Sequence, residues 1–301
     1  MEELVVAQHT TPTQVPNQQR LSDYLRGIFE QLPSNKSIKT ALKKQKILVD
    51  NQVAYSGDWV KPNSQIALLQ IDKTPTKVFP LLLDVLYEDD WLAVIHKPAG
   101  YTVSGNQFRT IENALPNNLT PSTQIDALAR PRIAHRLDAP TTGVLLVAKT
   151  HKVRIDLGRQ FEQKTIQKYY QALVVGKMPQ ESGTIDKPIG QKTATTHYTV
   201  KVSVPALKGE YLSWLDLKPT TGRTHQIRIH LAQSGCPILG DSLYGKEGLV
   251  LKHKGLFLLA KAIVFTHPTS QKEIKIETQT PPKYQKTIDK TQRQYHKSKM
   301  Q

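Results

Sequence analysis

Residues 134–149 read AHRLDAPTTGVLLVAK, and this stretch decides how the larger part of the chain is interpreted. A polar cluster, His135 to Asp138, runs through Pro140 and Gly143 into an apolar run that is typical of a buried β-strand. The cluster is therefore predicted to lie on a loop at the entrance to a strand, where a rigid scaffold can present the Asp138 carboxylate to a cleft. On spacing alone, the same residues could equally form an ion-paired turn on the surface.

Short alternations of apolar and polar residues lie on both sides of this stretch, from Val85 onward. Turn-forming residues separate them, as in VLYEDDWLAVIHKP, where residues 88–90 would form a hairpin tip. Two segments, near 151–164 and near 225–233, have helical spacing instead. Residues 83–284 are therefore predicted to form an α+β domain with a mostly antiparallel, mixed β-sheet and flanking helices.

A smaller αβ module is expected ahead of this domain, over residues 18–72. Apolar residues at helical spacing predict two short helices, and the alternation in ILVDNQVAYSGDWVKPNSQIALL predicts short strands after them. Lysines crowd onto the second helix and give the module a basic face; they are Lys36, Lys39, Lys43, Lys44 and Lys46.

The chain has 301 residues, with 41 Lys and Arg against 25 Asp and Glu, and a formal net charge of +16. Such an excess must face solvent or a polyanion, and nucleic acid is the leading partner. An anionic membrane is the alternative, but no run of about 18 apolar residues and no N-terminal signal pattern occurs. The single cysteine, Cys236, excludes an intramolecular disulfide and a multi-thiolate metal site within one chain. We expect a monomeric, cytoplasmic protein that binds no membrane.

Three further segments flank or connect the two domains. Residues 1–17 are polar and lack an apolar period, so a flexible tail is expected there. Residues 73–82 are rich in Lys, Thr and Pro, which suits a linker. Residues 285–301 are predicted to form a basic C-terminal tail, which is either an arm for RNA or a solvated end.

HRLDAPTTG at 135–143 closely resembles the catalytic loop of the RluA-type pseudouridine synthases, in which HRLD, two residues and Thr-Ser-Gly are usual. Thr142 replaces that serine and keeps the hydroxyl. Three further blocks resemble motifs of this family in its order and spacing: HKPAG at 96–100, KYYQALVVG at 168–176 and TTGRTHQIRIHLAQSGCPILGDSLYG at 220–245. Together the blocks span most of residues 83–268.

Residues 20–70 are similar to the small RNA-binding domain of the α-L type that often precedes this catalytic domain. The family pattern has Val-Asn-Gly and Gly-Asp where this chain has Val-Asp-Asn at 49–51 and Pro-Asn-Ser at 62–64, which changes the turns. The resemblance implies that the basic second helix contacts RNA through Lys39, Lys43 and Lys44.

The family resemblance implies an isomerase that converts a uridine in structured RNA into pseudouridine. The reaction breaks the C1′–N1 bond, rotates the uracil and joins C5 to C1′, and it needs no cofactor and no metal. Asp138 matches the family's aspartate, which attacks the nucleoside covalently or stabilises the sugar fragment. Tyr170 matches its active-site tyrosine, and the adjacent Tyr169 would point to the opposite face of a strand.

A buried cation is expected beside Asp138, because burial next to the base would raise the pKa of the carboxyl and neutralise it at pH 7. Arg223 is the candidate, with contact to an RNA phosphate as its alternative role. Arg228 is the second choice for the ion pair and otherwise an RNA-binding residue. Arg136 either holds the flipped nucleotide or forms a structural ion pair. Ribosomal RNA is the expected substrate and tRNA the second possibility.

Three other interpretations remain open. A metal could bind His135, His225 and His230, but the five-residue spacing puts the last two on different faces of a helix. A glycoside or nucleoside hydrolase needs a second carboxylate, for which Asp241 stays a candidate. A non-catalytic RNA-binding or assembly protein could keep the fold, although binding alone does not require Asp138.

Overall fold

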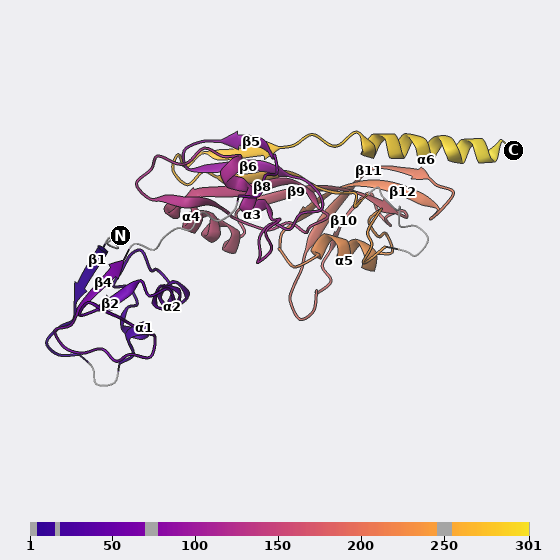
Figure 1. Cartoon of the computed structure of the whole chain (residues 1–301). Coiled ribbons are helices and arrows are strands. Elements are labelled where there is room, and N and C mark those ends of the chain that lie inside the picture. Colours follow the sequence, from indigo (N-terminus) through magenta and orange to yellow (C-terminus); the bar gives the residue numbers. More distant parts are fainter. Residues whose placement is uncertain (1–4, 16–18, 70–77, 246–254, 301) are drawn as a thin grey trace. The chain divides into compact units, whose positions relative to one another are not determined.

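The computed structural model describes residues 5–15, 19–69, 78–245 and 255–300 (Figure 1). The chain divides into two compact units, Met1–Thr76 and Lys77–Gln301, each with its own apolar core. Residues 73–77 of the predicted linker lie outside the described residues. Within the described ranges, no helix is both long and apolar enough to cross a membrane.

The N-terminal unit is a four-stranded antiparallel sheet with two short helices, in the strand order β1-β4-β2-β3. Its core is made by the apolar residues that were expected to be helical, including Leu25, Ile38 and Leu42, packed against Ile66 and Leu68 of the sheet. A reciprocal capping box between Ser34 and Ser37 fixes the start of the second helix. The elements are β1 (Val5–Thr10), α1 (Leu21–Tyr24), α2 (Asn35–Lys43), β2 (Ile47–Val49), β3 (Gln52–Val53) and β4 (Gln65–Leu69).

The expectation of a flexible tail over residues 1–17 is wrong for Val5–Thr10, which form β1. This edge strand pairs with β4 from Val5 opposite Leu69 to Thr10 opposite Gln65, so backbone hydrogen bonds hold it. Only Ala7 and His9 are half-buried, so the strand shows no apolar alternation from which it could have been predicted.

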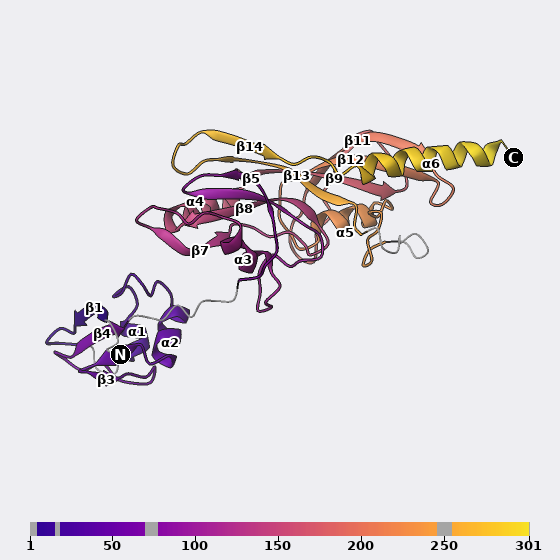
Figure 2. The same ribbon diagram turned by 45° about the horizontal axis from the view of Figure 1, so that its top comes forward.

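The C-terminal unit is built on a ten-stranded mixed sheet, and its α+β architecture with flanking helices confirms the predicted fold class (Figures 1 and 2). The strand order is β10-β11-β12-β9-β13-β8-β6-β5, with β14 paired to β13 and β7 paired to β8. Within the described residues of this unit, every pair of these strands is antiparallel except β13 with β8. The strands are β5 (Asp84–Glu88), β6 (Leu92–Lys97), β7 (Ala127–Ile133), β8 (Thr142–Thr150), β9 (Gln167–Val175), β10 (Ser182–Ile185), β11 (Thr196–Pro205), β12 (Tyr211–Pro219), β13 (Leu258–Thr266) and β14 (Glu273–Glu277).

The parallel pairing of β13 with β8 joins the two halves of this sheet, because β13 pairs with β9 on its other side. The contact is short, with Leu259 opposite Thr142 and Ala260 opposite Gly143. Gly143 has φ +117°, and a Cβ atom there would collide with the carbonyl of Ala260 and lie 2.8 Å from its nitrogen. The glycine that ends the HRLDAPTTG motif is therefore required for the sheet to close at this point.

Five helical segments accompany the sheet in the described part of this unit: α3 (Ile111–Ala114), the 3₁₀ helix η1 (Leu115–Asn117), α4 (His151–Glu162), α5 (Gln226–Gln233) and α6 (Lys283–Lys299). The helices predicted near 151–164 and 225–233 are confirmed as α4 and α5. The segment predicted as a basic tail, 285–301, is helical as far as Lys299. It begins as part of the domain, because Tyr284 and Ile288 are buried in the core that contains Phe257.

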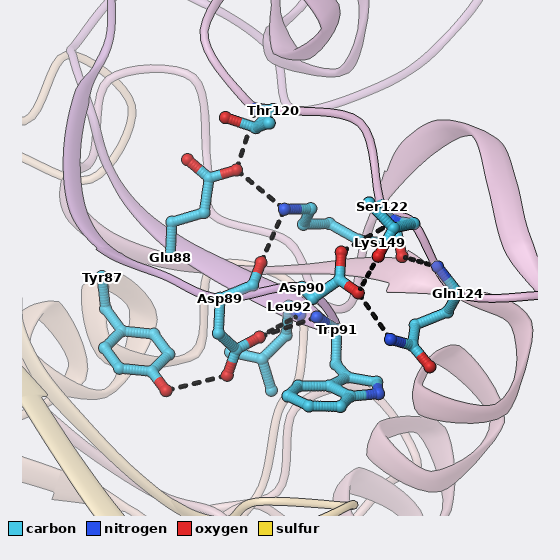
Figure 3. A network of polar contacts seen from close by, with 11 residues as sticks. Tyr87, Glu88, Asp89, Asp90, Trp91, Leu92, Thr120, Ser122, Gln124 and Lys149 are labelled. Carbon is cyan, nitrogen blue, oxygen red and sulfur yellow. Dashed lines mark hydrogen bonds and ion pairs between the residues drawn. The ribbon is translucent and has the colours of Figure 1, made fainter.

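The predicted hairpin tip at residues 88–90 is confirmed as the turn between β5 and β6, and a network of polar contacts fixes it (Figure 3). The Asp89 carboxylate accepts hydrogen bonds from the backbone N–H groups of Trp91 and Leu92, both at 2.8 Å, and from the Tyr87 hydroxyl at 2.8 Å. These bonds satisfy backbone donors that the turn leaves without a strand partner.

Asp90, the next residue, ties the tip to the segment before β7 (Figure 3). Its carboxylate accepts from Gln124 Nε2 at 2.5 Å and from the backbone N–H and hydroxyl of Thr123 at 2.8 and 2.7 Å. These hydrogen bonds, with that from Gln124 the largest contribution, lower the pKa of Asp90 to about 2.

The pKa of Asp90 predicts a pH-dependent contribution to stability. Because the pKa is lower in the folded state than in the unfolded chain, the contribution is full above about pH 4 and is lost as the pH falls toward 2. We expect Asp90→Asn to lower the Tm at pH 6 and to shrink the difference between wild type and variant between pH 4 and 2. Thermal unfolding followed by circular dichroism measures both.

A matched control for this experiment is Glu181→Gln, since Glu181 is exposed and its carboxylate has no partner among the described residues. The control should leave the difference from wild type constant across this pH range. A constant difference for Asp90→Asn as well would contradict the assignment of the low pKa to these hydrogen bonds.

Candidate active site

A pocket of about 500 Å³ opens beside the HRLD loop in the C-terminal unit. Its walls come from the loop at 134–141, from β9, from the turn at 219–225 that follows β12, and from the first residues of α5. The volume lies in the range of about 300–1,000 Å³ that is usual for small-molecule sites, so a nucleoside fits. The four motif blocks therefore meet at this pocket. Three of them line it, and HKPAG contacts the loop that carries Asp138.

Lys97, from the HKPAG block at the end of β6, binds the backbone of the HRLD loop through its buried side chain. Its fully buried ammonium donates hydrogen bonds to the carbonyl oxygens of Pro98, Ala139 and Thr141, at 2.9, 3.0 and 2.8 Å. Burial lowers the pKa of Lys97 to about 8, while the negative charge of Asp138 opposes this shift. The lysine therefore fixes the backbone that presents Asp138 rather than facing the pocket itself.

Asp138 lies on the pocket wall with a side chain that is 16% exposed. Its Oδ2 is 3.6 Å from Nη1 of Arg228, and its Oδ1 is 3.7 Å from Nε2 of His225. Both partners come from the start of α5, so one carboxylate oxygen faces a permanent cation and the other faces an imidazole.

Arg228 is held in this position by Asp241, which follows α5 in the chain. The guanidinium binds the Asp241 carboxylate in bidentate geometry, Nε to Oδ2 at 2.8 Å and Nη2 to Oδ1 at 2.7 Å. Asp241 also accepts from the backbone N–H groups of Leu243 and Tyr244 at 2.9 and 3.1 Å. Burial opposes the ionisation of Asp241, but these hydrogen bonds, led by that from Arg228, outweigh it and lower its pKa. The remaining amino group of Arg228 is left to face Asp138.

The expectation that Arg223 pairs with Asp138 is wrong, and the second choice, Arg228, takes that position. Arg223 lines the pocket, but its Nε donates to the carbonyl oxygen of Thr193 at 3.0 Å. The physical reason is that Arg223 precedes α5, which begins at Gln226. Arg223 belongs to the turn on the pocket rim, while Arg228 is inside the helix and buried.

Asp241 cannot serve as the second carboxylate that a hydrolase needs. Its side chain is fully buried, at 0% exposure, and its oxygens are engaged by Arg228 and the backbone. It therefore cannot reach a water molecule in the pocket.

His225 belongs to the site, although the sequence suggested it only as a candidate metal ligand. It precedes α5 in the left-handed conformation, with φ 56°, a conformation that is uncommon for a residue other than glycine. Its Nδ1 is 2.9 Å from the Tyr244 hydroxyl, which leaves Nε2 facing Asp138. Tyr244 also lies against Arg228, with the guanidinium carbon 5.2 Å from the ring centroid. No signal in the sequence distinguishes these two residues from others in the same block.

The other two histidines of the metal interpretation have structural roles. His135 accepts a hydrogen bond from the Leu146 N–H at its Nε2, and burial lowers its pKa to about 3, so its ring is neutral. His230 is buried and bonded to the Thr196 hydroxyl and the Lys187 carbonyl. Among the described residues, no group of three or more His, Cys, Asp or Glu could hold a metal ion.

Tyr170 lines the pocket, and Tyr169 does not. Tyr169 donates its hydroxyl hydrogen to Gln167 at 2.7 Å and lies 5.3 Å from the ammonium of Lys218. Burial raises the pKa of the Tyr170 hydroxyl, and the charge of Asp138 raises it further. Tyr170 is therefore a protonated hydrogen-bond donor at neutral pH, with its ring on the pocket wall.

The predicted RNA-binding residues lie in two places. Arg136 lines the pocket and is exposed, and its guanidinium has no partner in the part of the chain that the structure describes. Lys39, Lys43 and Lys44 are exposed on or directly after α2, in the N-terminal unit.

Comparisons with known proteins are consistent with these motifs. Residues 91–233 match the RNA pseudouridylate synthase family. The chain is 39% identical over 212 residues to the ribosomal large subunit pseudouridine synthase D of Nitrosomonas europaea. The aligned region covers 62% of this chain and 59% of that relative's length. It is 31% identical over 300 residues to the protein of the same name in Xanthomonas campestris, covering 89% and 88% of the two chains.

A solved structure has the same fold. Human RNA pseudouridylate synthase domain containing 4 superposes with a TM-score of 0.54 at 24% identity, over 66% of this chain and 88% of that one. At this identity the likeness concerns the arrangement of strands and helices.

The bidentate pair between Arg228 and Asp241 predicts a large loss of stability on removal of the carboxylate. Asp241→Ala should lower the free energy of unfolding by about 3–5 kcal/mol, because it leaves a buried guanidinium without its main counter-ion. Urea denaturation measures the change. Lys275→Ala, which breaks the exposed pair of Lys275 with Glu277, is the control and should cost less than about 1 kcal/mol. Equal losses in the two variants would contradict the structural importance of the buried pair.

Proposed function

The chain belongs to the RNA pseudouridylate synthase family, and from that premise we propose that it converts a uridine in structured RNA into pseudouridine with Asp138 as the catalytic carboxylate. The observation that carries the proposal is the position of Asp138 on the wall of the pocket, beside the charged group of Arg228. The guanidinium supplies a fixed positive charge that balances the charge of the carboxylate and holds it at the pocket.

The reaction begins with extrusion of the target nucleotide, since the C1′–N1 bond of a stacked uridine is out of reach. Flipping the base costs a few kcal/mol, which contacts along the RNA backbone must supply. Arg136 is suited to this step, because it is exposed at the pocket and its guanidinium has no partner among the described residues. The exposed lysines Lys39, Lys43 and Lys44 would add phosphate contacts from the N-terminal unit.

Inside the pocket, Asp138 acts at the nucleoside while the glycosidic bond breaks. The uracil rotates, C5 joins C1′, and the hydrogen at C5 leaves as a proton, so the product is an isomer of the substrate. Tyr170 provides a ring for the uracil face and a protonated hydroxyl that donates a hydrogen bond. Arg228 takes no part in proton transfer, because guanidinium does not lose its proton. Its role is to hold and charge-balance Asp138.

Large-subunit ribosomal RNA is the substrate that we propose, with tRNA as the alternative. The support is the name of the two relatives described above, ribosomal large subunit pseudouridine synthase D. Because both relatives come from bacteria, in which ribosomal RNA is made in the cytoplasm, the proposal includes a cytoplasmic location.

Release of tritium from uracil C5 tests the proposed reaction, because joining C5 to C1′ must expel that hydrogen. We expect the wild type to release tritium from large-subunit ribosomal RNA transcribed with [5-³H]uridine, and Asp138→Asn to release none above background. Asparagine has the same shape as aspartate, so loss of release reports loss of the carboxylate. Transfer RNA labelled in the same way is the parallel substrate. No release from either RNA by the wild type would reject catalysis and favour a binding or assembly role.

A matched pair of arginine variants tests whether Arg228, and not Arg223, is the partner of Asp138. Arg228→Lys keeps a positive charge, but an ammonium cannot bind Asp241 in bidentate geometry and face Asp138 as well. We expect it to lower kcat by about 10²–10³, the usual cost of removing one aligned charged donor from an active site. Arg223→Lys should change kcat far less and act mainly on KM. Single-turnover tritium release separates the two quantities. If the Arg223 variant loses more kcat than the Arg228 variant, the assignment is wrong.

A further inference from the structure

Helix α6 carries a row of cations along one side. Lys286, Lys290, Arg293 and Lys297 are spaced at i, i+4, i+7 and i+11, and all four are exposed. At 3.6 residues per turn they fall within about 60° of the helix circumference and extend over about 16 Å. We call these four residues the α6 cation row.

The opposite side of α6 is anchored in the core of the unit. Tyr284 and Ile288 are 1% and 3% exposed. The Tyr284 ring lies 5.3 Å from the ring of Phe257 and 5.7 Å from that of Trp214, between centroids. Figures 1 and 2 both show α6 running alongside β11 and β12 and continuing beyond them. The packing therefore fixes which side of the helix faces outward, and that side is the cation row.

The stability of the helix does not account for the α6 cation row. Lys286 is near the N-terminus, where the helix dipole disfavours a positive charge, and no acidic residue is present in the first turn. Neighbouring cations at i, i+3 and i, i+4 repel each other. The helix has one acid, Asp289, which accepts a hydrogen bond from Gln285 at 2.8 Å. Only Lys297, in the last turn, is favoured by the dipole.

In the part of the chain that the structure describes, the α6 cation row has no acidic partner. Among the described residues, no carboxylate lies within ion-pair distance of any of its four members. Arg293 donates from Nε to the backbone carbonyl of Asp289 at 3.3 Å, which leaves its charge without a carboxylate partner among the described residues. A row of cations without carboxylate partners on a fixed helix is complementary to a regularly spaced polyanion. An anionic membrane is a poorer match, because the two buried apolar residues of α6, Tyr284 and Ile288, are packed in the core of the unit and are not available to insert.

We propose that the α6 cation row binds the phosphate backbone of the RNA substrate, as a contact separate from the uridine pocket. No residue of α6 lines that pocket, so the row would hold a part of the RNA other than the target nucleotide. The inference rests on the proposed function for the identity of the polyanion. Each cation that neutralises a phosphate releases a counter-ion, so the contact contributes to the salt dependence of binding.

The salt dependence of RNA binding tests this contact with two variants of equal net charge. Lys290→Gln/Arg293→Gln removes two charges from the row. Gln285→Glu/Gln292→Glu, the control, makes the same change of net charge on exposed positions about 120° around the helix. The dissociation constant for a large-subunit ribosomal RNA hairpin of about 20 base pairs is measured by fluorescence anisotropy between about 50 and 200 mM KCl.

We expect the row variant to reduce the slope of log K against log salt by about 2, one unit for each phosphate that is no longer neutralised, and the control to keep the wild-type slope. An unchanged slope in the row variant overturns the inference, and so does an equal reduction in both variants, which would indicate a general effect of net charge. Loss of binding to phosphatidylserine vesicles with an unchanged RNA slope would also overturn it, in favour of a membrane.

The outcome is independent of catalysis, because tritium release and the salt slope are separate measurements. A reduced slope in the row variant without tritium release by the wild type would reject the proposed reaction and keep the RNA contact. Tritium release by the wild type with an unchanged slope in the row variant would support the proposed reaction and reject the RNA contact of the α6 cation row.

Discussion

The buried pair between Arg228 and Asp241 is the interaction on which the site depends. A guanidinium has five donors in one plane, and two of them are fixed by the Asp241 carboxylate, which the backbone N–H groups of Leu243 and Tyr244 hold in turn. The remaining amino group, Nη1, then faces Asp138, 3.6 Å away. Because buried ion pairs seldom stabilise a fold more than apolar residues would, the value of this pair lies in the orientation that it gives to the charge.

The pocket exists because neighbouring central strands of the sheet bring segments that are distant in the sequence close together. Strand β13 pairs with β9 on one side and with the first residues of β8 on the other, so the loop before β8 meets Tyr170 of β9. This close approach needs the missing side chain of Gly143. Lys97 binds the carbonyls of the loop and so restrains the backbone on both sides of Pro140. Rigidity at Asp138 thus comes from residues that do not touch the substrate.

Local pattern was sufficient where neighbouring residues decide the structure. The hairpin tip at 88–90, the helices α4 and α5 and the mixed sheet follow from turn residues and apolar spacing, and all of them are present. The pattern failed for β1, an edge strand that is held by backbone pairing, and for the last segment, where Tyr284 and Ile288 dock a helix in place of the predicted tail. In both cases the stabilising contacts are with residues far away in the sequence.

The sequence by itself determined the chemistry that is available: an aspartate on a loop at a strand entrance, a tyrosine on a following strand, and a block with two arginines. Only the tertiary structure decided which arginine serves Asp138 and that His225 and Tyr244 belong to the site. The two arginines are five residues apart, and the start of α5 at Gln226 divides them. One is left in the turn and the other is buried in the helix. Which of them reaches a carboxylate some 90 residues earlier depends on how the helix packs against the sheet, and no local pattern specifies that packing.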